Sequence, residues 1–401
     1  MKILFTFILS LLSFGVRGSA PADIPAGTPV RVPADTPAGT PAVTPAAVPV
    51  RVPAGTSAAA PADTAGIVAA PTLETLTAEV EALKSKTSAW SKVLERLPRI
   101  SGYVQAGYEW SETSSTFFLK RVRLNLAGDI LKKLDYRVQI EFCSPKIVDV
   151  YLRYRPFEVL NLQLGEYKLP FSIENTDYVP SKYELIEYPL SLRRLMGFDD
   201  ICGLSATGRD MGAMLYGGFF RREGYSVLNY HIGVFNGEGL NTKDRNKSKD
   251  LCAKLTLRPV PGLQIAGSYY RGEYGADHRK RIRYGAGVCY DRGRVLLRGE
   301  YIYGTTGMPA AETAPAYDLD SEGWYAVAGW HVTPSLMPVV RYDTFREDAS
   351  SSASRQTDYT AGLLWQPVKY FRCQLNYTYK EFAARSLSDR NVVAVMFTGI
   401  F

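Results

Sequence analysis

The feature that most constrains the fold of this chain is an alternation of polar and apolar residues that recurs through residues 100–401. Residues 135–142 (Asp-Tyr-Arg-Val-Gln-Ile-Glu-Phe) alternate without a break. The same period of two appears in residues 121–126, 149–155, 251–258, 281–290, 294–303 and 371–380. Successive side chains of a β-strand point to opposite faces, so each segment has one apolar and one polar face. The segments approach the ~9–11 residues of a tilted bilayer-spanning strand and exceed the ~5–6 residues common in soluble sheets.

The spacing of these segments predicts the class of barrel. We expect sixteen strands, at residues 100–110, 116–128, 135–143, 147–156, 160–167, 209–219, 225–236, 250–258, 263–272, 281–290, 294–303, 322–331, 336–346, 357–365, 369–380 and 389–401. Every even-numbered connection is short. The odd-numbered ones include all the long segments, at residues 168–208, 237–249, 304–321 and 347–356. Short turns at one end and long loops at the other are typical of an outer-membrane barrel with periplasmic turns.

The first hundred residues differ in composition and are divided into three predicted segments. Residues 1–20 have a basic residue, an apolar run and the small residues Gly18, Ser19 and Ala20, which predicts a signal peptide cut after Gly18 or Ala20. The apolar run is shorter than the ~20 residues of a spanning helix. Residues 21–71 are rich in Pro, Ala and Thr, which predicts a disordered, extended linker.

At residues 72–98 the Pro/Ala-rich composition ends, and apolar residues recur with a period close to 3.5 residues. Apolar residues recur at alternating spacings of three and four, with one polar member, at Leu73, Leu76, Val80, Leu83, Thr87, Trp90, Leu94 and Leu97. Such a seam predicts a periplasmic helix that forms a coiled coil with copies of itself. A single amphipathic helix packed on its own domain remains the alternative, because so short a coiled coil is marginal. The barrel is predicted to occupy residues 99–401.

The last predicted strand carries an assembly signal. Val393, Val395, Phe397, Gly399 and Phe401 form one face of an alternating strand with an aromatic residue at its end. We expect the outer-membrane assembly machinery to recognise it through Phe401. The other expected partners of the barrel wall are the lipid bilayer and lipopolysaccharide. The predicted fold is therefore all-β, a 16-stranded antiparallel transmembrane β-barrel preceded by a short coiled-coil helix and a Pro/Ala-rich linker.

Four motifs in order resemble the phosphate-selective porin O/P family. They are Phe-Leu-Lys-Arg-Val-Arg-Leu at residues 118–124, Gly-Glu-Tyr-Lys-Leu-Pro-Phe at 165–171 after Asp-Val-Tyr-Leu at 149–152, Gly-Val-Phe-Asn-Gly-Glu-Gly at 233–239, and Asp-Arg-Asn-Lys-Ser-Lys-Asp at 244–250. The resemblance covers residues 100–401. It implies a sixteen-stranded, often trimeric channel for inorganic anions in the outer membrane of a Gram-negative bacterium, and it leaves the preferred solute open.

The polar faces of the predicted strands favour a positively charged lumen. Fixed cations with several N–H donors can replace the water that an anion loses in a narrow passage. Lys and Arg outnumber Asp and Glu on these faces about two to one. The candidate pore-lining, anion-binding residues are Arg121, Arg123, Arg153, Lys168, Arg193, Arg194, Arg281 and Arg283. We expect Arg121, Arg123, Lys168 and Arg193 to converge at one depth. The alternative is that these arginines only pair with the carboxylates of a polar barrel interior.

The connection at residues 168–208 is the longest in the barrel, and loops beyond ~12–15 residues are usually functional. In porins, this third outer loop commonly folds into the lumen. The loop carries both signs of charge, so it is not the sole source of anion preference. A loop that lies outside as a cap remains the alternative.

Other functions fit the sequence less well. The chain has three histidines, His231, His278 and His331, none in a nucleophile motif, so we expect no enzyme, cofactor or metal site. Asp244, Asn246, Ser248 and Asp250 have the spacing of a calcium loop, but its Gly and Glu positions hold Lys and Leu. The net charge of +7 is spread out, which argues against nucleic acid. Five cysteines without a CxxC pair predict no essential disulfide. A general diffusion pore and a non-conducting structural or adhesin barrel remain alternatives.

Overall fold

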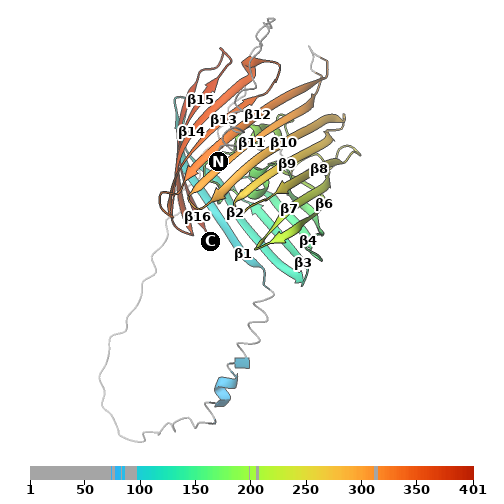
Figure 1. The fold of residues 1–401 in the computed structure, drawn as a ribbon, viewed down its shortest axis with the longest axis vertical. Coiled ribbons are helices and arrows are strands. Elements are labelled where there is room, and N and C mark those ends of the chain that lie inside the picture. Colours follow the sequence, from blue (N-terminus) through green and yellow to red (C-terminus); the bar gives the residue numbers. More distant parts are fainter. Residues whose placement is uncertain are drawn as a thin grey trace, which may run out of the picture. The chain divides into compact units, whose positions relative to one another are not determined.

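Sixteen antiparallel strands close into one barrel (Figure 1). The computed structural model describes residues 74, 77–82, 84–85, 97–197, 199–204, 207–310 and 315–401. The strands are β1 (Arg99–Ser111), β2 (Ser115–Leu131), β3 (Leu134–Glu141), β4 (Lys146–Tyr154), β5 (Asn161–Lys168), β6 (Arg209–Arg222), β7 (Tyr225–Phe235), β8 (Asp250–Leu257), β9 (Leu263–Tyr274), β10 (Arg279–Arg292), β11 (Val295–Met308), β12 (Tyr317–Trp330), β13 (Leu336–Arg346), β14 (Arg355–Val368), β15 (Phe371–Phe382) and β16 (Arg390–Ile400). The predicted strand number and antiparallel closure are confirmed.

The barrel closes where β1 pairs with β16. Tyr103 lies opposite Ile400 in this register. Two backbone hydrogen bonds join Gly102 and Phe401, with N···O distances of 2.8 and 3.0 Å. A Cβ atom on Gly102 would lie 2.4 Å from the Phe401 ring, so this close approach requires glycine.

The connections differ between the two ends of the barrel, as predicted. At one end, hereafter the turn end, the even-numbered connections span two to six residues, at 132–133, 155–160, 223–224, 258–262, 293–294, 331–335 and 369–370. All the long connections lie at the other end, the loop end. No helix among the described residues is long and apolar enough to cross a membrane.

The two faces of each strand meet different surroundings. Outward side chains such as Val340 are apolar and exposed, whereas the next residue, Arg341, points inward and is buried. Outward aromatic rings contact one another across adjacent strands, with centroid distances of 4.8 Å for Trp324–Tyr342 and 5.4 Å for Tyr342–Tyr359. Such rows of aromatic rings are typical of the membrane–water interface. The alternation in the sequence therefore separates the outer surface from the lumen.

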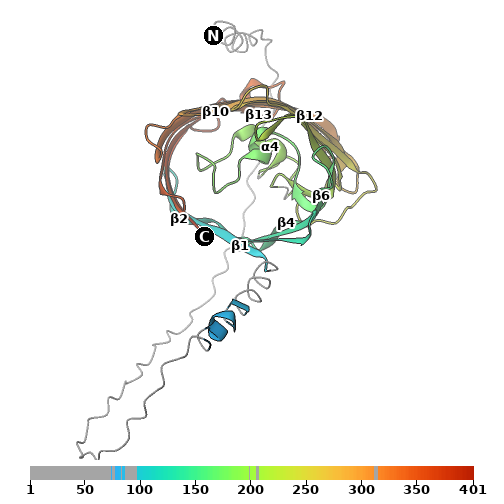
Figure 2. The ribbon, with the colours of Figure 1, turned by 60° about the horizontal axis from the view of Figure 1, so that its bottom comes forward.

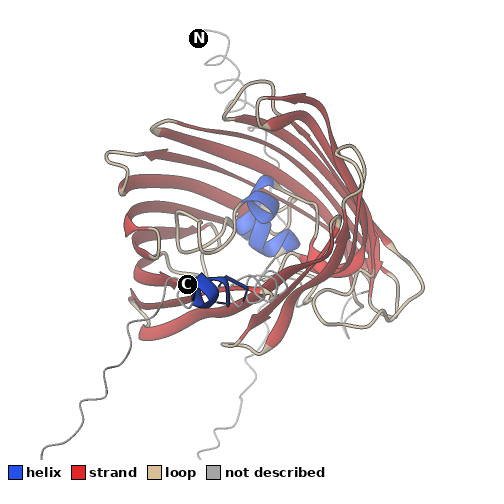
Figure 3. Ribbon diagram, turned by 90° about the horizontal axis from the view of Figure 1, so that it is seen from below, coloured by secondary structure: helices blue, strands red, loops and turns tan. Residues whose placement is uncertain are grey.

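The long connection between β5 and β6, hereafter the inserted loop (residues 169–208), lies inside the barrel rather than outside as a cap. Figures 2 and 3 show its two short helices, α3 (Ile173–Asp177) and α4 (Leu190–Met196), within the ring of strands. The loop buries an apolar cluster against the inner wall. The loop side of this cluster includes Leu169, Phe171, Ile173, Leu185, Leu192 and Leu195, and the wall side includes Ile302, Tyr325, Val339 and Phe345. Burial of these side chains holds the loop in the lumen.

The segment before the barrel is described only in part. Residues 74, 77–82 and 84–85 are helical and exposed. The predicted signal peptide (1–20) and linker (21–71) lie outside the described residues, as do most positions of the heptad seam. The division into these segments and the pairing of the helix stay predictions.

Candidate functional site

The candidate cations divide into three groups. Arg121, Arg123, Arg153 and Lys168 come from β2, β4 and β5, Arg193 and Arg194 from α4, and Arg281 and Arg283 from β10. We call the inward cations of β2–β4, namely Arg121, Arg123, Arg137, Arg153 and the adjoining Arg155, the arginine wall. We call the inward cations of β10–β13, namely Arg281, Arg283, Arg298 and Arg341, the loop-bearing wall.

A bulge in β2 changes which residues of this strand face the lumen. Gln105 of β1 lies opposite Arg121, but the next residue, Ala106, lies opposite Leu119. Lys120 is left unpaired in the register, and its ammonium forms an ion pair with Glu187 of the inserted loop. Arg121 donates a hydrogen bond to Oε1 of Gln105 at 3.0 Å. Lys120 and Arg121, which are adjacent in the sequence, therefore both face the lumen. A strict alternation of inward and outward residues would place Lys120 on the outside, so it is absent from the predicted pore-lining residues.

The strand registers order the arginine wall by depth. Arg123 lies opposite Glu141, Gln139 lies opposite Asp149, and Asp135 lies opposite Arg153. From the loop end to the turn end, the inward cations are therefore Arg121, Arg123, Arg137 and Arg153, in that order. The cations form a series along the barrel rather than one ring.

The carboxylates of this wall are shared. Asp135 accepts Arg153 at 3.0 Å and Arg155 at 2.7 Å. Asp149 accepts Arg209 of β6 at 2.8 Å and lies 3.7 Å from Arg137. Two carboxylates thus serve three guanidinium groups of the wall and that of Arg209 on β6, which leaves positive charge uncompensated on this side of the lumen. The side chains of Arg137, Arg153 and Arg155 are 32%, 31% and 47% exposed, so this charge is accessible from the lumen.

The loop-bearing wall presents its cations differently. Arg281 pairs with Asp200 at 2.6 Å, and both side chains are at most 1% exposed. Arg283 donates to the carbonyl oxygens of Leu195 at 3.0 Å and Thr305 at 2.8 Å. The contacts to Asp200 and Leu195 reach the inserted loop, so these two arginines fasten the loop to β10.

Arg298 of β11 holds the inserted loop through two carboxylates. It pairs with Glu174 and Glu184 of the inserted loop, both at 2.8 Å. Its guanidinium lies 3.7 Å from the centroid of the Tyr178 ring, within the range of a cation–π contact. Burial beside Glu184 and Glu300 raises the pKa of Glu174 to about 7, despite the opposing effect of Arg298.

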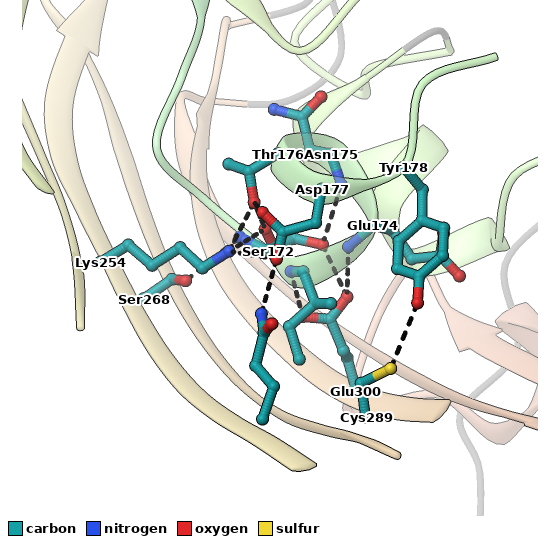
Figure 4. Close-up of polar contacts among 12 residues, drawn as sticks. Ser172, Glu174, Asn175, Thr176, Asp177, Tyr178, Lys254, Ser268, Cys289 and Glu300 are labelled. Carbon is teal, nitrogen blue, oxygen red and sulfur yellow. Dashed lines mark hydrogen bonds and ion pairs between the residues drawn. The ribbon is translucent and has the colours of Figure 1, made fainter. Parts of the chain in front are cut away.

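Glu300 of β11 fixes the start of α3, as Figure 4 shows. Its carboxylate accepts hydrogen bonds from Oγ of Ser172 at 2.6 Å, from the backbone N–H of Ile173 at 2.6 Å and from that of Glu174 at 3.2 Å. Lys254 of β8 donates to the Ser172 carbonyl at 3.0 Å. These contacts satisfy backbone groups that a short helix leaves without partners, and they hold the loop in one position.

Arg193 and Arg194 of α4 face away from the loop-bearing wall, toward the arginine wall or the loop end. Arg193 pairs with Asp199 and lies 3.6 Å from Glu187, whereas Arg194 pairs with Glu347 of the β13–β14 connection. Burial alone would raise the pKa of Glu187, but Lys120 and Arg193 lower it to about 2. These cations therefore favour the ionised form of Glu187 between the loop and β2.

Of the four cations expected to converge at one depth, Arg121 and Arg193 come together, whereas Arg123 and Lys168 lie elsewhere. Arg121 and Arg193 both act electrostatically on Glu187. Arg123 lies one inward position deeper and pairs with Glu141 at 2.8 Å. Lys168 instead donates to the carbonyl oxygen of Asn175 in α3. The signal for the missed Lys120 is the sequence Phe-Phe-Leu-Lys-Arg at 117–121, where two successive cations break the alternation.

The calcium-like spacing has a structural explanation. The side chain of Asp244 accepts the backbone N–H of Asn246 at 2.9 Å, and that of Asn246 accepts the N–H of Ser248 at 2.8 Å. These are local turns that lead into β8. Within the part of the chain that the structure describes, no group of three His, Cys, Asp or Glu side chains could hold a metal ion.

Comparison with known proteins identifies relatives of this barrel. Residues 100–397 match the sequence model of a family described as phosphate-selective porin O and P. The fold is similar to an anion-selective porin from Comamonas acidovorans, with a TM-score of 0.58 and 14% identity over 76% of this chain and 99% of that one. It is also similar to the trimer form of OmpT from Vibrio cholerae (TM-score 0.55, 10% identity, 76% and 99% covered). OmpF of Salmonella typhi, in complex with daunomycin, gives a TM-score of 0.54 at 13% identity, with 77% and 98% covered. A comparison with curated protein sequences gave no match.

Proposed function

Because the chain belongs to the phosphate-selective porin O and P family and is an outer-membrane diffusion porin, we propose that its channel is selective for small inorganic anions. The observation that carries this proposal is the sharing of Asp135 and Asp149 among four guanidinium groups on one side of the lumen. The anion-selective porin of similar fold supports the same selectivity. No other function is favoured by a specific contact.

The geometry suggests how an anion would pass. Guanidinium N–H groups replace part of the hydration shell of an oxyanion or chloride, often by paired hydrogen bonds. The apolar barrel wall around the lumen strengthens the field of these fixed charges. Because the cations of the arginine wall follow one another in depth, an anion leaves one as it reaches the next. Conduction requires such binding at several weak sites.

The candidate residues take different roles in this proposal. Arg121, Arg123, Arg153 and Arg193 supply the field along the path, together with Lys120, Arg137 and Arg155. Arg281 and Arg283 act as fasteners of the inserted loop, since their donors are engaged by Asp200 and by carbonyl oxygens. Lys168 ties β5 to α3. Arg194 lies with Glu347 toward the loop end.

The test is the reversal potential of the full-length protein in planar bilayers across a KCl gradient. We expect chloride to permeate more readily than potassium. Neutralising two exposed cations of the wall, Arg153→Gln with Arg155→Gln, reduces this preference. The control pair Lys243→Gln with Lys247→Gln removes the same charge from the exposed β7–β8 connection and leaves the preference unchanged. A cation-selective wild-type channel would contradict anion selectivity and leave a general diffusion pore.

We further propose that the protein is a homotrimer in the outer membrane, with its turn end and N-terminal segment in the periplasm. The trimer form of the similar OmpT barrel and the heptad seam before β1 support this arrangement. Deleting residues 73–97 leaves the barrel folded and weakens the trimer, because three helices lose their common seam. Cross-linking of the intact and deleted chains measures the change. A strictly monomeric intact chain would refute the trimer.

A further inference from the structure

One carboxylate of the inserted loop lies where cations from two elements meet. Glu187 pairs with Lys120 of β2 and lies 3.6 Å from Nη1 of Arg193 in α4. Arg121 adds a third positive charge that stabilises its ionised form. The Glu187 side chain is 45% exposed, so solutes in the lumen reach it.

The backbone that carries Glu187 is fixed on both sides. Arg341 of β13 donates to the Glu187 carbonyl oxygen at 2.6 Å. Ile186 is buried in an apolar cluster with Ala394 and Met396. Tyr188 donates to the carbonyl oxygen of Tyr178 at 3.0 Å and stacks on Tyr183 at 4.6 Å. The carboxylate therefore moves only by rotation of its own side chain.

Two other carboxylates that pair with lumen arginines, Glu141 and Glu174, are less free than Glu187 to leave their partners, whereas Asp199, which also pairs with Arg193, is 46% exposed. The side chain of Glu141 is 4% exposed and that of Glu174 is 0% exposed. Separating these buried charges from their arginines would leave both charges uncompensated. Glu187 can instead turn into the solvent of the lumen, where a separated carboxylate is hydrated. It is a small oxyanion attached to the loop by three single bonds.

We propose that Glu187 is a tethered competitor that holds Lys120 and offsets the nearby charges of Arg121 and Arg193, and that a small oxyanion such as phosphate displaces it in order to bind there. This inference rests on the proposed anion path. If the carboxylate holds the donors for about nine-tenths of the time, the apparent dissociation constant of the anion rises about tenfold. The return of the carboxylate then helps to release the anion. With its pKa held at about 2, Glu187 competes throughout the neutral range.

The test measures how inorganic phosphate reduces the single-channel chloride current. Glu187→Gln removes the competing charge at unchanged size. Glu187→Asp keeps the charge but withdraws it by one methylene. We expect the half-blocking phosphate concentration to fall about tenfold or more for Glu187→Gln and to fall clearly for Glu187→Asp. The matched control is Glu109→Gln, which removes an inward carboxylate on β1 outside this cluster and changes the concentration less than about twofold, by long-range charge alone.

Three outcomes would overturn the inference. Equal shifts in Glu187→Gln and Glu109→Gln, with none in Glu187→Asp, would mean that only net charge matters. Weaker phosphate block in Glu187→Gln would mean that Glu187 positions Lys120 and Arg193 for the anion. Unchanged block in every variant would mean that phosphate does not bind there. Heat-modifiable electrophoretic mobility confirms that each variant is folded. An anion-selective wild type with any of these results rejects the competitor alone, whereas a cation-selective wild type rejects the proposed function.

Discussion

The arginine wall and the loop-bearing wall have the same sequence pattern but differ in how much of their charge is exposed. On both walls, arginines occupy inward positions of strands in which polar and apolar residues alternate. On the loop-bearing wall, side chains such as Arg281 and Arg298 are at most 1% exposed and are engaged by the inserted loop. On the arginine wall, Arg121 and Arg123 are also buried, but Arg137, Arg153 and Arg155 remain about one-third to one-half exposed and share their carboxylates. One set of cations holds the loop in the lumen, and the other faces the remaining passage.

The difference shows that an inward arginine is not by itself a transport residue. The inserted loop divides the inward cations, because it covers the loop-bearing wall and reaches the arginine wall only near Lys120 and Arg121. Substitutions on the loop-bearing wall should therefore change stability first, and those on the arginine wall should change selectivity first.

The largest expected effect is on stability at Arg298. Replacing it by Leu leaves the buried carboxylates of Glu174 and Glu184 without their common cation, which costs about 3–5 kcal/mol. Arg153→Leu removes a partly exposed pair whose carboxylate keeps Arg155, and costs about 1 kcal/mol or less. Urea unfolding of both variants in lipid vesicles measures the difference. Equal losses would contradict the division between the walls.

The next effect concerns Arg281, which fastens the loop through Asp200. Arg281→Gln should lower the urea midpoint, since it leaves Asp200 buried without its cation. Its reversal potential in a KCl gradient should stay close to that of the wild type. A selectivity change as large as that of the Arg153→Gln, Arg155→Gln pair would place Arg281 on the anion path after all.

The selectivity itself should depend on salt. Mobile ions screen fixed charges over a Debye length of ~10 Å at about 0.1 M and ~3 Å at about 1 M. The chloride preference should therefore weaken as mean KCl concentration rises, and neutralising Arg153 and Arg155 should matter most in dilute salt. Reversal potentials at a constant concentration ratio and increasing mean concentration measure this trend. A preference independent of salt would indicate selection by pore size.

The last effect is the pH dependence of the loop anchor. Since the pKa of Glu174 is raised from 4.5 to about 7, the folded protein retains a proton there that the unfolded chain has lost. The free energy of unfolding should therefore fall as pH rises from about 4.5 to about 7. Urea midpoints at pH 5 and pH 8 should differ less in Glu174→Gln than in the wild type. An identical difference in both would assign the pH dependence to another group.

The sequence predicted the barrel well because a period of two directly reports which residues face lipid. It was less informative about the lumen. The position of the inserted loop depends on Leu169, Phe171 and Ile173 finding apolar partners on distant strands, and these partners are not identifiable from the loop itself. The aliphatic content of the loop was nevertheless a signal, since an external cap would expose these residues to water.

The sequence does not separate the two proposed roles of the arginines for a similar reason. Arg153 and Arg281 both occupy inward positions, and strand parity carries no information about what fills the lumen opposite each. Lys120 was missed because a bulge shifts the parity by one residue within β2. Long-range packing and local backbone irregularity therefore decide what alternation leaves open.

The pairing of Gly102 with Phe401 makes the barrel a ring whose first and last strands complete each other. Removal of any one strand would leave two edges with rows of unpaired N–H and C=O groups facing hydrocarbon, at several kcal/mol for each group. A partly assembled ring is therefore not a stable state within the bilayer core. Closure of the seam and transfer into lipid must occur together, so a membrane that contains this barrel contains every one of its strands.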